Sequence, residues 1–95
     1  MRGGAPQYSN RICAEEAVKI LEDYPSGMTT RALIEALIQR KVSRAKVLTV
    51  RGFSRELFLA MDDGRLPIFC TGSYAGVDYK SRRLWYHNKY KNDKV

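Results

Sequence analysis

The sequence has few of the residues on which a disulfide framework, a metal site or a membrane span depends. It has two cysteines and one histidine in 95 residues, too few for the dense disulfides of small secreted domains or for zinc-ligand spacing. No stretch approaches the roughly 20 apolar residues that cross a bilayer, and no basic leader precedes an apolar run. We therefore expect a cytoplasmic protein with reduced thiols, no metal or other cofactor, and no membrane association.

Groups that could carry catalysis are also scarce. Cys13 and Cys70 have no catalytic partner in sequence and fall on predicted apolar faces, which favours structural packing. Asp62 and Asp63 form an acidic pair, but neighbouring helical residues point about 100° apart. They also lie at a predicted helix C-terminus, where the helix dipole disfavours carboxylates. No Gly-Lys-Ser or Gly-Lys-Thr follows a strand, so we expect a protein that is not an enzyme.

Acidic residues are scarce in two parts of the chain, and this sets the net charge. The 17 Lys and Arg residues outnumber the 10 Asp and Glu residues, for a net charge of +7. Residues 38–61 contain six basic residues and one acidic residue, and residues 79–95 contain the same numbers. Two blocks as one-sided as these favour a polyanionic partner over an ordinary mixed surface.

The apolar pattern predicts one domain of three helices and a C-terminal pair of strands, an α+β fold that is mainly α. The expected boundaries are a flexible N-terminal arm at 1–11, the domain at 12–87 and a mobile basic tail at 88–95. The helices are expected to begin near residues 10–13, 29–30 and 43, and to end before Pro25, near Lys41 and near Asp63. The strands are expected in "RLPIFCTGS" and "RRLWYHN", with a turn at "YAGVDYKS".

The third helix is the least regular of these elements. Helical spacing is kept by Val47, Val50 or Phe53, Leu57, Phe58 and Met61. Gly64 suits the left-handed position that follows a helix end. Two courses fit the sequence: one helix continuous from a cap at Ser43, or a break at Gly52 with Ser54 as a second cap.

Two stretches carry a family resemblance. In "GMTTRALIEAL" a Gly-polar-Thr turn opens the second helix, and in "DGRLPIF" the third helix passes through glycine into a strand. With the order of elements, they resemble the winged helix-turn-helix superfamily over roughly residues 12–87. The resemblance implies a third helix in the major groove and a hairpin wing against the DNA backbone or minor groove. The region from Arg40 to Ser54 is a few residues longer than the link and recognition helix of such domains.

The resemblance implies that both basic blocks contact DNA and form one surface. The candidate nucleic-acid-binding residues are Arg40, Lys41, Ser43, Arg44, Lys46, Arg51 and Arg55 in the third-helix region, and Lys80, Arg82 and Arg83 in the wing. On a continuous helix Arg44, Arg51 and Arg55 lie close to one face. Arg44 or Arg51 is the first candidate for a bidentate contact with guanine. Ser43 or Ser54 could offer a hydroxyl and a backbone N–H to a phosphate.

The aromatic residues near the C-terminus allow two interpretations. We expect Trp85 to hold the hairpin on the helices as part of the core rather than to stack on bases. Tyr74 and Tyr79, nearer the turn, are expected to be exposed. An exposed aromatic beside basic residues would also fit single-stranded nucleic acid, which leaves RNA and single-stranded DNA open as targets.

Two functions fit these observations. The first is a small transcriptional regulator that binds double-stranded DNA, with a homodimer for a long site because one domain reads only a few base pairs. No appended helix would make that dimer, so domain faces or the N-terminal arm would. The second is a small viral or mobile-element protein that docks on an acidic surface of a host protein complex and inhibits it. Binding to random duplex DNA at two salt concentrations distinguishes these functions.

Overall fold

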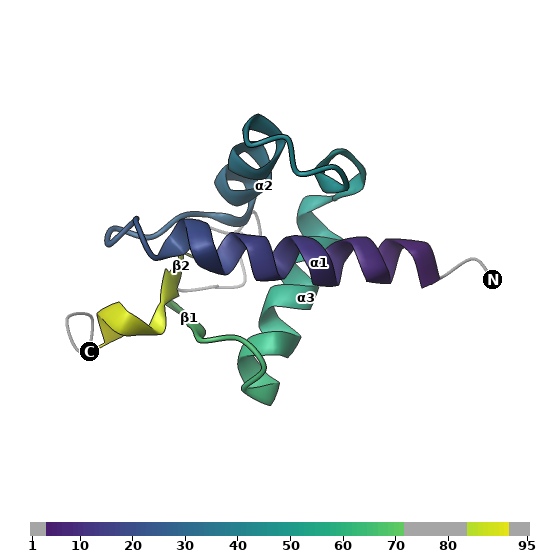
Figure 1. The fold of residues 1–95 in the computed structure, drawn as a ribbon. Coiled ribbons are helices and arrows are strands. Elements are labelled where there is room, and N and C mark those ends of the chain that lie inside the picture. Colours follow the sequence, from purple (N-terminus) through teal and green to yellow (C-terminus); the bar gives the residue numbers. More distant parts are fainter. Residues whose placement is uncertain (1–3, 72–83, 92–95) are drawn as a thin grey trace, which may run out of the picture.

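Three helices and a two-stranded sheet make up the part of the chain that the structure describes. The structure is a computed structural model that describes the backbone of residues 4–71 and 84–91, with side chains from Ser9 onward. Its elements are α1 (Gly4–Leu21), α2 (Thr30–Gln39), the 3-10 turn η1 (Ala45–Val47), α3 (Val50–Asp63), β1 (Ile68–Thr71), β2 (Leu84–His87) and the 3-10 turn η2 (Asn88–Tyr90) (Figure 1). The strands pair antiparallel. The expected α+β, mainly α fold with a C-terminal hairpin is confirmed.

The first helix is longer than expected. α1 begins at Gly4, so residues 4–11 are helical and the expectation of a loose arm is wrong for them. Pro6 does not prevent this, because the first four backbone N–H groups of a helix have no partner within the helix. Residues 1–3 lie outside the described part of the chain. None of the described helices is both long and apolar enough to cross a membrane.

The core lies where α1 packs against α2 and α3; in Figure 1 α1 crosses in front of α3, and α2 lies above it. The largest fully buried side chains are Trp85, Phe53, Ile20, Leu21, Leu33, Leu37, Leu57 and Cys13. Burying one such large apolar side chain contributes about 1.5–3 kcal/mol. The core therefore draws on all three helices and on β2, and it fixes the orientation of each.

The second strand is tied to both sides of the molecule. β1 and β2 pair in the register Ile68↔His87, Phe69↔Tyr86, Cys70↔Trp85 and Thr71↔Leu84. On its other side Trp85 exchanges two backbone hydrogen bonds with Met28, of 3.0 and 2.8 Å. Trp85 is fully buried, and its Nε1–H donates to Thr30 Oγ1 at 3.0 Å, as its predicted place in the core requires. Gly27 has φ +80°, and a Cβ there would lie 2.7 Å from the Tyr86 ring, so the turn requires glycine.

A 3-10 turn and a shorter helix replace the long third helix. Neither expected course is correct, because the chain leaves the helical conformation just before Val50. Thr49 is the N-cap of α3, and its Oγ1 accepts the Gly52 N–H at 3.0 Å. Ser43 lies in the link and Ser54 lies inside α3, so neither caps this helix. Gly64, at φ 75°, ends α3 in the left-handed conformation that we expected.

The extra length of the link is folded onto the body. Val42, Ala45 and Leu48 recur every third residue, as a 3-10 turn requires to keep one face inward. Ala45 is fully buried, and the other two pack against the core. Val47 is 66% exposed and Phe58 is 42% exposed, so these two residues do not belong to the apolar stripe in which the sequence placed them.

The beginning of the expected tail is ordered against the first helix. Residues 88–91 form η2 and one further helical residue, and the Tyr90 hydroxyl donates to the Glu22 carbonyl. The expected mobile tail over 88–95 is therefore wrong for its first four residues. Residues 92–95, and the turn expected within 72–83, lie outside the described residues.

Candidate nucleic-acid interface

A stretch without acidic residues joins α2 to the first half of α3. Between Glu35 and Glu56 the sequence has six basic residues and no Asp or Glu. The six are Arg40, Lys41, Arg44, Lys46, Arg51 and Arg55, and all are exposed. The link (residues 40–49) runs from α2 to the N-terminal end of α3, on the side of the body away from β1 and β2 (Figure 1). We name Arg40, Lys41, Arg44, Lys46 and Arg51 the basic end.

Only two of the three arginines expected on one helix face share a helix. Arg51 and Arg55 are four residues apart on α3, which places both on its outer surface. Arg44 precedes η1 and is separated from them by the break before Thr49. The expectation that all three arginines align on one continuous helix is therefore wrong.

The link begins with a lysine in an unfavourable conformation. Lys41 has φ 63°, in the left-handed region. Its N–H donates to the Ile38 carbonyl at 2.9 Å, and the Val42 N–H donates to the Leu37 carbonyl at 3.1 Å, the two bonds of a Schellman motif. Glycine is usual at this position, and a residue with a Cβ costs about 1–2 kcal/mol there. The chain thus has a positive charge where a glycine would be more stable.

Several basic residues elsewhere are held by carboxylates of the same chain. Arg65 pairs with Glu56 through Nη1 and with Asp63 through Nε, each at 3.3 Å. The hydrogen bond that Arg65 donates to Glu56, more than any other contact, raises the pKa of Arg65. Lys19 pairs with Glu16 at 3.4 Å. By contrast, no ion pair within residues 4–71 and 84–91 includes Arg40, Lys41, Lys46, Arg51 or Arg55.

The hydroxyl at the start of α3 belongs to Thr49 rather than to a serine. Thr49 is exposed, and it uses its oxygen to accept the Gly52 N–H, which leaves its O–H able to donate to a phosphate beside Arg51. Ser43 is also exposed, but no helix begins there. Thr49 immediately before Val50, with Phe53 further along the apolar period, is the N-cap signal in the sequence that would have identified this residue.

The wing candidates fall outside the described residues. They are Lys80, Arg82 and Arg83, together with the tyrosines Tyr74 and Tyr79. From the second basic block the structure describes Lys89 and Lys91, at the end of segment 84–91. In Figure 1 this segment, drawn in yellow, lies at the opposite end of the body from the link. The expectation of one surface from both blocks therefore does not hold for these two lysines.

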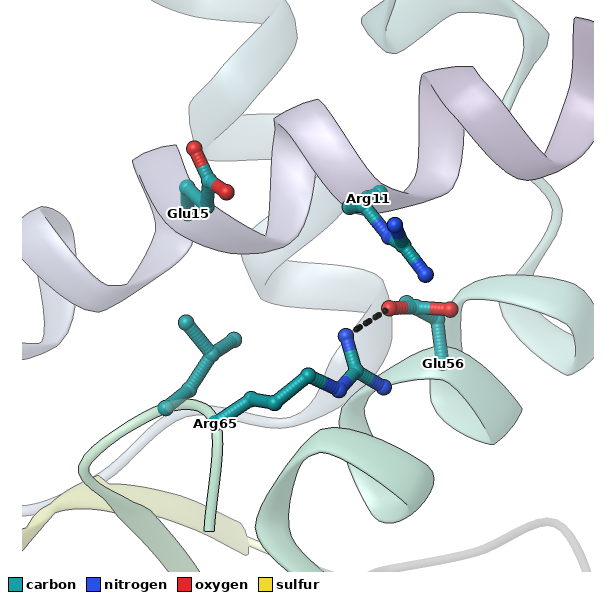
Figure 2. Close-up of a pocket in the computed structure, with 5 residues that line it drawn as sticks. Arg11, Glu15, Glu56 and Arg65 are labelled. Carbon is teal, nitrogen blue, oxygen red and sulfur yellow. Dashed lines mark hydrogen bonds and ion pairs between the residues drawn. The ribbon is translucent and has the colours of Figure 1, made fainter. Parts of the chain in front are cut away.

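A charged hollow of about 290 Å³ lies between α1, α3 and the segment that follows α3. Figure 2 shows Arg11 and Arg65 directed toward the carboxylate of Glu56, with Glu15 on the neighbouring turn of α1. Two cations and two anions balance each other in this lining. This balance of charges does not favour binding of a polyanion. The ion pair between Arg65 and Glu56 joins the segment after α3 to the middle of that helix.

The two cysteines differ in how far they are buried. Both are free thiols; Cys13 is buried and Cys70 is half-buried. Burial raises the pKa of Cys13, and the positive charge of Arg44 opposes this rise. The thiol is thus kept in its less reactive form. Among the described residues, no group of three His, Cys, Asp or Glu side chains could hold a metal ion.

The outer face of α3 has a second feature that sequence reasoning missed. Phe58 and Leu59 are 42% and 41% exposed, and they follow Arg55 by three and four residues. The exposed Asp62 follows on the same face. Phe53, Leu57 and Ala60 are the buried residues of α3, and at 100° per residue Phe58 and Leu59 fall outside the face that these three form.

Comparisons of the chain with protein-family models, with curated proteins and with solved structures found no match. The case for a function therefore depends on the residues and their arrangement.

Proposed function

We propose that this protein binds double-stranded DNA through the basic end and acts as a small transcriptional regulator in the cytoplasm. The observation that carries this proposal is the stretch between Glu35 and Glu56, which has six exposed basic residues and no acidic residue; most of the six have no carboxylate partner among the described residues. Lys and Arg near phosphates release condensed counterions, which supplies most sequence-independent affinity. The free thiols support a reducing compartment, and binding rather than catalysis is the proposed activity.

We further propose that the domain is a member of the winged helix-turn-helix superfamily. The order of three helices and two strands supports this, as does the pairing of Met28 with Trp85, which adds a short bridge between the first two helices to the sheet. The unusual length before α3 contains η1, which packs against α1 and α2. The proposed approach is end-on, with the first turn of α3 toward the major groove and Arg51 as the guanine contact.

The test is binding to random duplex DNA over a range of salt concentrations. We expect micromolar binding that weakens steeply with salt, because each phosphate contact adds about −0.9 to the slope of log K against log salt. Arg40→Ala and Lys46→Ala should each weaken binding to all sequences and reduce the slope by about 1. Arg51→Ala should change the preference among sequences. Lys19→Ala removes the same charge from α1 and serves as the matched control; its affinity should stay unchanged.

A second candidate function is docking on an acidic surface of another protein. Val47 favours it, because this side chain in the link is 66% exposed, and phosphate contacts make no use of an apolar side chain. Absence of duplex binding even at low salt would overturn the DNA proposal and leave this candidate. Equal loss of affinity in Lys19→Ala and Lys46→Ala would show that overall charge, and not the basic end, determines binding.

A further inference from the structure

The outer face of α3 combines opposite charges with apolar side chains. Arg55, Phe58, Leu59 and Asp62 are all exposed, and at 100° per residue they lie within an arc of about 100°. Along the helix the order is basic, apolar, apolar, acidic. An exposed apolar pair flanked by opposite charges differs from the link, whose charged residues are all basic.

The acidic residue at the end of this face is in an unfavourable place. Asp62 lies in the last turn of α3, where the negative end of the helix dipole repels a carboxylate. Asp63 beside it is compensated by Arg65 at 3.3 Å, but no ion pair among the described residues includes Asp62. Arg55 is two turns away, about 10 Å along the axis, too far for an ion pair within one helix.

We propose that this face of α3 packs against the same face of a second copy, with the two helices antiparallel. The pattern is symmetric about a point between Phe58 and Leu59: Arg55 lies three residues before Phe58, and Asp62 lies three residues after Leu59. A two-fold axis at that point places each Arg55 opposite the partner's Asp62, with the apolar residues at the centre. One surface is then complementary to itself, as a closed dimer requires.

This dimer accounts for the four exposed residues together. Each Asp62 gains a cationic partner, which no described residue of its own chain supplies, and the apolar pair is withdrawn from water. Arg51 would face position 66 of the partner, beyond the end of its α3, and so stays available in the basic end. One helix face is smaller than the roughly 1,600 Å² interface of a stable complex, so the dimer is a weak one. The inference does not depend on DNA binding.

The experiment is sedimentation equilibrium of the full chain at increasing concentration, without nucleic acid. We expect a monomer–dimer equilibrium. Arg55→Asp and Asp62→Arg should each weaken dimerisation on the order of tenfold or more, because two attractive pairs become repulsive. The double variant Arg55→Asp/Asp62→Arg should restore it. A mixture of the two single variants should form a heterodimer, since both of its charge pairs are then attractive.

Circular dichroism of each variant confirms that it is folded before its mass is interpreted. Val47→Ser, which changes an exposed apolar residue away from this face, is the matched control and should dimerise as the natural chain does. Phe58→Ser should weaken the dimer. A chain that stays monomeric at all concentrations would overturn the proposal, and so would a mixture of single variants that does not associate. Neither result would bear on DNA binding, which is measured separately.

Discussion

The hydrogen bond between Trp85 and Thr30 offers a sharp test of how the hairpin is held on the helices. Thr30→Val preserves the shape of the side chain and removes the acceptor of the Trp85 Nε1–H, which lies 3.0 Å away with both residues buried. A buried donor left without a partner costs about 1–3 kcal/mol. A loss near 2 kcal/mol lowers Tm by about 8–16 °C in a domain of this size. We therefore expect a large fall in Tm from the loss of one oxygen atom.

Urea and thermal unfolding followed by circular dichroism measure this change. Thr71→Val makes the same substitution on β1 at a half-buried residue, and it should stay within about 0.5 kcal/mol of the natural chain. Trp85→Phe removes the donor, and the double variant completes a cycle in which the two losses should not add. A Thr30→Val protein as stable as the natural chain, or strictly additive losses, would refute the role given to this bond.

Two further predictions concern the ends of the link. Thr49→Ala removes the N-cap of α3 and should cost about 1 kcal/mol in chemical unfolding, whereas Ser43→Ala should cost almost nothing; equal losses would contradict the assignment of the cap. Lys41→Gly should stabilise the protein by about 1 kcal/mol, because glycine adopts a φ of 63° without steric cost. The same change should weaken DNA binding; unchanged affinity would show that Lys41 does not contribute to DNA binding.

The sequence was sufficient for the fold class but not for the elements at the centre of the site. Apolar spacing placed Leu33, Leu37 and Leu57 in the core, and Trp85 was correctly assigned to packing. The predicted course of the third helix was wrong because Ser43 and Ser54 were taken as N-caps. A cap is determined by which hydroxyl the backbone brings to an N–H two or three residues ahead, and tertiary packing of the buried Ala45 decided that in favour of Thr49.

The basic end was found from charge alone, because charge runs need no knowledge of geometry. Knowing which arginines share a helix face does require the geometry. Arg44 was wrongly grouped with Arg51 and Arg55 because the helix was taken as continuous. The exposed Phe58 and Leu59 were missed for a related reason. Helical spacing alone assigns any apolar residue to the stripe, whichever side of the helix faces the core. Only the packing of Phe53 and Ala60 shows which side that is.

The two proposals together constrain how the protein would act on DNA. In an antiparallel pair of α3 helices, the N-terminal ends point in opposite directions, and each basic end lies at an N-terminal end. Such a dimer would present its two basic ends at opposite poles instead of side by side. Adjacent half-sites on one duplex require both binding surfaces on the same side of the dimer. The arrangement is suited instead to joining two separate segments of DNA, and the weakness of the α3 contact would make that joining depend on how much protein is already bound.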